Sequence, residues 1–306
     1  MIIINNAQII INQVLVFYLM IFVGVYAGKI KILNETTNFA LSRLLLNITL
    51  PFFIISSFNY QFSSDTLKNM LIILAFGIII HPICYFVGLL IYRKYVSSTK
   101  SILVFSLIFT NCGYMAYPIL ESIYGKIGII YGSIFLAPFN IYLWTIGILL
   151  FKKEKLQSKY LILNPGIIAV FIGVIIFSFS IKLPFFLDKS ITVIGQMTTP
   201  LSMIIIGGII SQMNVSQMLK NKLIYINSII RLIVIPLLIF LILKIFDLDS
   251  TVYGICVLIV SMPVAVTLPI FAKRYDGDSQ LASTSIFIST LISIITIPSF
   301  VLLLTL

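Results

Sequence analysis

Long apolar runs separated by short polar breaks make up almost the whole sequence. A helix needs about 20 residues to cross a hydrocarbon core about 30 Å thick. Strands of a β-barrel would be about half as long and would alternate in polarity, which these runs do not. The pattern predicts an all-α polytopic membrane protein with ten transmembrane helices, at residues 8–28, 37–58, 68–92, 101–120, 127–151, 164–181, 190–212, 223–246, 251–272 and 280–304.

The composition excludes several classes of protein. Hydrophobic residues make up 60% of the 306 positions and charged residues only 9%. So few charges cannot cover a water-soluble surface, and a disordered chain would be far less apolar. The net charge of +11 does not predict a nucleic-acid partner, because basic residues of membrane proteins collect in cytoplasmic loops beside anionic lipid. We expect the lipid bilayer to be the partner.

The basic residues also predict the orientation of the chain. With the N-terminus outside, fourteen of the twenty Lys and Arg residues lie in or beside the odd-numbered connections and five in or beside the even-numbered ones, while Arg231 falls deep within a span. Basic residues are enriched on the cytoplasmic side. We therefore expect a multi-pass protein of the cell membrane with both termini extracytoplasmic.

Distinctive residues recur along the chain at a spacing of about 150 positions. The pairs are Pro51 with Pro200, Pro118 with Pro269, Lys31 with Lys182, and His81 with Arg231. They predict two five-helix repeats, 1–151 and 164–306, joined by a short cytoplasmic linker at 152–163. Because five is odd, the second repeat is inverted, which is typical of secondary transporters.

Spans four and nine carry proline near their middle. Proline cannot donate a backbone hydrogen bond, so we expect free carbonyls at Tyr114, Ile259 and Ala265. Unpaired backbone cannot face lipid and must line protein or a polar cavity, where half-helix N-termini suit an anion. A single proline kink is common in membrane helices, but two at matching places in an inverted repeat favour a binding site.

The residues around these prolines resemble those of the auxin efflux carrier family, which includes plant PIN-type carriers and bacterial malate or malonate permeases. Pro263 and Pro269 followed by Phe271–Tyr275 (FAKRY) resemble its ninth-span pattern, and Asn111–Pro118 followed by Tyr124-Gly125 resembles its fourth. Weaker matches at Asn47, Pro51, Pro200, Gly207 and Gly208 extend the resemblance over most of the chain. The short linker is more similar to the compact bacterial permeases.

The resemblance implies a fold, a mechanism and a site. Spans one, two, six and seven would form a scaffold, and spans three to five and eight to ten a transport domain in which broken helices four and nine cross. The activity would be secondary transport of small organic anions, such as dicarboxylates or auxin-like carboxylates, by an elevator-type alternating-access mechanism. The candidate substrate-binding residues include Tyr114 and Thr267 because these flank the breaks. The full set is Asn47, Asn111, Cys112, Gly113, Tyr114, Pro118, Pro263, Val264, Thr267 and Pro269.

Two ionisable side chains inside the spans are candidates for a supporting or coupling role. A charge at the centre of a span costs about 3 kcal/mol, so Arg231 should face the protein interior or a wet cavity, either attracting an anion or bonding backbone carbonyls. His81 is a candidate proton carrier or a hydrogen-bonded structural residue. No Asp or Glu lies deep in a span, so proton coupling, sodium coupling and uniport all stay open.

Other classes of function have weaker support. We expect no enzyme, cofactor or metal site, because the GxxxxGK[ST], HExxH and GxSxG patterns do not occur. A sodium-coupled symporter of the bile-acid-transporter type shares the crossover architecture in outline and is the nearest alternative. An anion channel is less favoured, since no selectivity filter or arginine ladder is visible. The substrate, the transport direction and homodimer formation stay open.

Overall fold

The computed structural model describes residues 2–59, 63–151, 164–212, 221–275 and 277–305. These residues are helical apart from short connections and one isolated two-residue bridge. The elements are α1 (Ile2–Lys29), α2 (Glu35–Leu44), η1 (Leu45–Thr49), α3 (Leu50–Ser57), α4 (Ser64–Ile91), α5 (Ser97–Ile108), η2 (Cys112–Ala116), α6 (Tyr117–Trp144), α7 (Ile146–Phe151), α9 (Pro165–Ser178), α10 (Phe185–Gln196), α11 (Thr198–Ser211), α13 (Lys222–Ile229), η3 (Ile230–Val234), α14 (Ile235–Leu243), α15 (Ser250–Ser261), α16 (Leu268–Arg274) and α17 (Ser279–Thr305). The η segments are π-helical turns. The predicted linker, 152–163, lies outside the described residues.

Helices long and apolar enough to cross a membrane account for much of the chain. Within the described ranges there are six, at Glu35–Ser57, Ser64–Ile91, Cys112–Phe151, Phe185–Ser211, Lys222–Leu243 and Ser279–Leu304. Shorter apolar helices occur at Leu15–Lys29, Ser97–Ile108, Pro165–Ser178 and Ser250–Ser261. Each of the predicted spans overlaps one of these helices.

The polar breaks in the sequence start the helices. A polar side chain just before a helix accepts a hydrogen bond from a backbone amide of the first turn, which has no partner within the helix. The capping residues are Asn34, Ser63, Asn164, Asn221 and Asp249. The break predicted after span four behaves differently, because α6 runs through it and kinks at Gly125, where φ is 61° and ψ is −146°. Glycine adopts that conformation far more readily than other residues.

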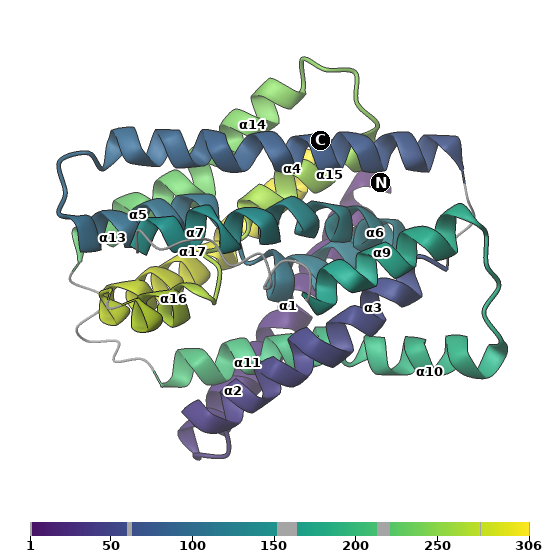
Figure 1. Ribbon diagram of the computed structural model, residues 1–306, viewed down its shortest axis with the longest axis horizontal. Coiled ribbons are helices and arrows are strands. Elements are labelled where there is room, and N and C mark those ends of the chain that lie inside the picture. The colour runs from purple at the N-terminus through teal and green to yellow at the C-terminus, as the bar shows by residue number, and fades with distance from the viewer. Residues whose placement is uncertain (1, 60–62, 152–163, 213–220, 276, 306) are drawn as a thin grey trace.

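The helices pack most extensively within two groups, which contacts of α1 with α17 and of α6 with α9 join (Figure 1). The first group contains α1 to α3 and α9 to α11, and the second contains α4 to α7 and α13 to α17. Within the first, the backbones of α1 and α11 approach so closely that a Cβ at Gly207 would overlap backbone atoms of Ile21 and Val25. Small residues permit such approach between membrane helices, where apolar burial alone gives little attraction.

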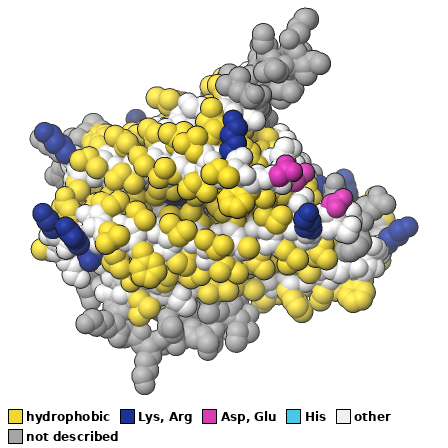
Figure 2. All heavy atoms as spheres, turned by 90° about the horizontal axis from the view of Figure 1, so that it is seen from above, with side chains coloured by type: hydrophobic (Ala, Val, Ile, Leu, Met, Phe, Trp, Pro, Cys, Tyr) yellow, Lys and Arg dark blue, Asp and Glu magenta, His cyan; other side chains and the backbone are white. Residues whose placement is uncertain are grey.

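The molecular surface is rich in large hydrophobic side chains. Phe22, Phe86, Phe171 and Phe185 are each more than half exposed. Figure 2 shows a broad hydrophobic face on which charged side chains are few and lie mostly near its borders. A soluble protein rarely exposes so large an apolar patch, whereas a membrane protein presents one to lipid.

Candidate functional site

The two predicted breaks meet at a crossover of the chain. Helical conformation stops between α5 and η2 and again between α15 and α16. There Thr110 and Val264 form an isolated antiparallel bridge. The N–H of Asn111 donates a hydrogen bond to the carbonyl of Pro263 at 2.7 Å. The prediction that spans four and nine are interrupted is therefore confirmed.

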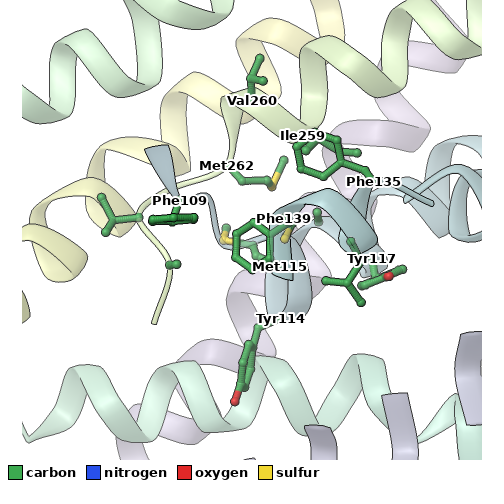
Figure 3. Packing of buried hydrophobic residues seen from close by; sticks show 14 of the residues in the cluster. Phe109, Tyr114, Met115, Tyr117, Phe135, Phe139, Ile259, Val260 and Met262 are labelled. Atoms are coloured by element: carbon green, nitrogen blue, oxygen red, sulfur yellow. The ribbon is translucent and has the colours of Figure 1, made fainter. Parts of the chain in front are cut away.

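Neighbouring groups support the crossover. On the other side of the bridge the N–H of Ala265 donates to the carbonyl of Phe109 at 3.0 Å, and the N–H of Val264 donates to Oγ of Ser289 on α17 at 3.2 Å. Buried hydrophobic residues pack around the two paired chain segments, as Figure 3 shows for Phe109, Met115, Phe139 and Met262. This packing excludes lipid from the exposed backbone, as a membrane protein requires.

The unpaired backbone groups at the crossover differ from those predicted. The carbonyl of Ile259 accepts from the N–H of Met262 at 3.4 Å, and that of Ala265 accepts from Leu268 at 3.1 Å. The predicted free carbonyls at these two positions were wrong, because the chain tightens into three-residue turns that use them. Instead, the crossover brings together the residues that begin the next helices: Gly113 and Tyr114 lie in the first turn of η2, and Thr267 is the N-cap of α16. Backbone N–H groups in a first helical turn have no partner within the helix.

A cavity of about 890 Å³ lies beside the crossover. Its walls come from α2, η1, α6, α9, α11, α16 and α17 as well as from the crossover. The predicted substrate-binding residues that line it are Asn47, Asn111, Gly113, Tyr114, Thr267 and Pro269. The fold thus brings six candidate residues from both halves of the sequence to one space.

The other four candidates, Cys112, Pro118, Pro263 and Val264, do not line this cavity. All four are buried. Pro118 lies in the first turn of α6, and Pro263 and Val264 take part in the backbone pairing through their main chain. Their contribution to the site is the path of the backbone.

Several groups that line the cavity have unmet hydrogen-bonding capacity. Both polar atoms of the Asn38 amide and the hydroxyls of Thr110 and Thr267 are buried without a hydrogen-bond partner in the described part of the protein. A Cβ added at Gly113 would meet no atom within 4 Å, so this glycine borders open space. Buried polar groups are normally paired, and unpaired ones around a cavity indicate a polar ligand or water.

Part of the cavity wall was not predicted from the sequence. Arg43 was not a predicted substrate-binding residue, yet it lines the cavity together with Asn38, Ser42, Asn140 and Gln212. Asn38 and Ser42 are four residues apart, which places them on one helix face, but Asn47 joins them only because the π-helical turn η1 shifts the helix phase by about one residue, which the sequence alone does not show. Nδ2 of Asn47 donates to the carbonyl of Arg43 at 2.8 Å, which keeps the two side by side.

His81 and Arg231 lie away from the cavity, each with a relative exposure of 1%. Nδ1 of His81 is 2.6 Å from the carbonyl of Gly77, and its ring stacks on Tyr142 with centroids 5.2 Å apart. Arg231 lies in η3 and is close enough to His81 to interact with it electrostatically. The structure therefore brings these two residues of distant helices near each other.

Comparisons with known proteins agree on one family. The sequence profile of the family described as membrane transport protein matches residues 9–160 and 154–301. An uncharacterized transporter of Methanocaldococcus jannaschii is 25% identical over 308 residues, which covers 94% of this chain and 96% of the relative. An uncharacterized transporter of Methanothermobacter thermautotrophicus is 23% identical over 298 residues, with the same coverage of both chains. The protein is therefore a multi-pass membrane protein that belongs to the membrane transport protein family, the family of the auxin efflux carriers, whose members are transporters and not enzymes.

Proposed function

We propose that this protein is a secondary transporter of small organic anions, such as dicarboxylates or auxin-like carboxylates, that binds its substrate in the cavity beside the crossover. The observation that carries the proposal is that residues of the first turns after the two breaks, Gly113, Tyr114 and Thr267, line one cavity. First-turn N–H groups have no partner within the helix, carry partial positive charge and bind carboxylate oxygens well.

The side chains around these amides suit the same ligand. The hydroxyl of Thr267 has no hydrogen-bond partner among the described residues, so a carboxylate can accept from it. Arg43 adds a positive charge to the wall formed by α2, and Asn47 adds an amide beside it. Asn111 and Pro269 border the same space, while Cys112, Pro118, Pro263 and Val264 direct the backbone behind it.

We propose that the chain crosses the membrane ten times, as two inverted repeats of five spans. Two of the shorter helices, α5 and α15, would each be half of a broken span. The backbone supports the repeat: the non-glycine residues with positive φ, Lys31 and Ser180, follow the first helix of each half. Likewise Pro118 and Pro269 each stand in the first turn of the helix after a break.

The two groups of helices support an elevator mechanism. The first group, α1 to α3 with α9 to α11, would be the scaffold, and the second would be the transport domain that moves against it. The cavity lies at their border, with Arg43 and Asn47 on the scaffold and the crossover on the transport domain. Among the described residues, hydrogen bonds between the groups include those from Tyr18 Oη to the carbonyl of Ser293 at 3.2 Å and from Thr199 Oγ1 to Glu121 Oε2 at 3.3 Å, which sliding would have to break.

We propose that the protein resides in the cell membrane with both termini extracytoplasmic. In that orientation, the cavity would be open to the cytoplasm. The basis for this is that its wall reaches residues at the ends of odd-numbered connections: Glu35, Asn164, Gln212 and Gln280.

A sodium-coupled symporter of the bile-acid-transporter type is the second candidate. Oδ1 of Asn38 and the hydroxyl oxygens of Thr110 and Thr267 are oxygens without hydrogen-bond partners within the described residues, and all three residues line the cavity. Such oxygens are ligands that sodium accepts. Imposed sodium and pH gradients distinguish sodium coupling, proton coupling through His81, and uniport. An anion channel is a third reading, and it predicts conductance without counterflow.

Counterflow of labelled carboxylates in proteoliposomes tests the proposal. A panel of malate, malonate, succinate and an indole carboxylate is offered to the wild-type protein and to the Asn111→Ala and Pro269→Ala variants. We expect counterflow of at least one anion in the wild type and its loss in both variants. Ser299→Ala, at an exposed position of α17 away from the cavity, is the matched control. Wild-type rates in both cavity variants would reject the site, and conductance without counterflow would reject a carrier.

A further inference from the structure

Three buried side chains at the junction of α13 and η3 carry hydrogen-bond donors without partners within the described residues. Among the described residues, Nδ2 of Asn227, Oγ of Ser228, and Nε and Nη2 of Arg231 are buried and have no hydrogen-bond partner. The three side chains have relative exposures of 0%, 1% and 1%. Each of these four atoms can donate a hydrogen bond, and only the hydroxyl can also accept one.

Sequence spacing brings these donors within about one helical turn of each other. Asn227 and Ser228 are adjacent near the end of α13, and Arg231 follows them by four and three residues in the π-helical turn η3. The hydroxyl of Tyr92 donates to Oδ1 of Asn227 at 2.8 Å. Because that bond fixes the orientation of the amide, its NH₂ group is left directed elsewhere, with nothing to donate to.

The charge of Arg231 has no counter-charge in the described structure. The groups that interact with it electrostatically are the imidazole of His81 and the thiols of Cys84 and Cys112, which are not carboxylates. A guanidinium group stays protonated in proteins. An unpaired charge in a membrane interior is costly, so the site requires an anion or another polar partner.

We propose that Asn227, Ser228 and Arg231 form a binding site for a compact monovalent anion, either a halide ion or a carboxylate head group. The site is separate from the cavity beside the crossover, because none of its three residues lines that cavity. It is independent of the proposed transport activity. Its position close to Cys112 of η2 allows the bound anion to neutralise Arg231 next to the crossover.

The thermal unfolding midpoint of the purified protein, followed by circular dichroism, tests the site directly. Salts of equal ionic strength are compared, with methanesulfonate as the bulky reference anion, chloride and bromide in one arm, and formate and acetate in the other. We expect the wild-type midpoint to rise saturably by about 2 °C or more with a compact anion. A response to halides identifies an ion site and a response to carboxylates alone identifies a head-group site. No response in either arm overturns the proposal, whatever the variants do.

Variants then assign the response to these residues. Ser228→Ala should raise the half-saturating anion concentration about threefold or more, since one donor is lost from a charge-assisted set. Arg231→Met should abolish the response. Lys244→Gln, which removes an exposed charge just after α14, and Arg43→Gln, which alters the cavity, should both keep it. A response that survives in Ser228→Ala unchanged, or that disappears in Arg43→Gln, would place the anion elsewhere and overturn the assignment.

Discussion

The backbone N–H of Asn111 and the backbone carbonyl of Pro263, from opposite halves of the chain, are joined by a hydrogen bond of 2.7 Å. The same crossover includes the bridge between Thr110 and Val264. Because main-chain atoms make these contacts, side-chain changes around the cavity should alter ligand binding and leave the crossover itself in place. Variants at the cavity are therefore informative about transport and not only about folding.

Gly113→Ala should impair transport without lowering stability. A Cβ at this position meets no protein atom within 4 Å, so it enters the cavity where the proposed substrate lies. We expect KM to rise about tenfold, as one misplaced methyl group in a binding pocket typically causes, with an unchanged unfolding midpoint. Concentration-dependent uptake and circular dichroism on the same preparation measure both. An unchanged KM would remove Gly113 from the substrate contacts.

Gly125→Ala should lower the stability of the protein without affecting substrate binding. Its Cβ also meets no atom within 4 Å, but its φ of 61° lies where a side chain is strained. We expect a loss of about 1–3 kcal/mol of stability from the backbone conformation alone. Gly113→Ala is the matched control, since it adds the same methyl group in open space without a positive φ. Equal unfolding midpoints for the two variants would contradict a strained kink in α6.

Arg43→Gln should weaken uptake in a salt-dependent manner. The guanidinium lines the cavity and is exposed, so its attraction for an anion should be screened as ionic strength rises. We expect KM to increase several-fold at low salt and much less at high salt. Lys29→Gln, an exposed charge at the end of α1 that does not line the cavity, serves as control. A salt-independent defect would indicate a structural role for Arg43.

Ser42→Cys should be labelled by a membrane-impermeant maleimide from the cytoplasmic side. Ser42 lines the cavity, whereas the native Cys84, Cys112 and Cys256 are buried, so the unsubstituted protein should give little background. Labelling is compared in inside-out vesicles and in intact cells. A transported carboxylate in excess should slow the reaction. Faster labelling in intact cells would reverse the proposed orientation of the chain.

Much of the helical architecture could be predicted because it follows from local properties. Apolar length sets the helices, polar caps start them, and proline interrupts them near Asn111 and Pro263, so these features are present in short stretches of sequence. The break expected before Lys126 was only partly of this kind, since the positive φ of Gly125 lets α6 bend there and continue.

The cavity wall could not be predicted in the same way. Arg43 and Asn38 lie in α2, at the start of a long apolar helix where polar residues are common, and nothing in the neighbouring sequence indicates that they face the crossover. They face it because α2 packs against α11. The same holds for the electrostatic contact between His81 and Arg231, which belong to different helices.

Polarity and proline positions along the chain were thus enough to predict a membrane protein of interrupted apolar helices, because each depends on a few neighbouring residues. Contacts between distant helices established which interruptions meet and which side chains border the cavity. Those features arise from close packing of segments that the sequence separates, and the π-helical turns at η1, η2 and η3 further change which residues share a helix face.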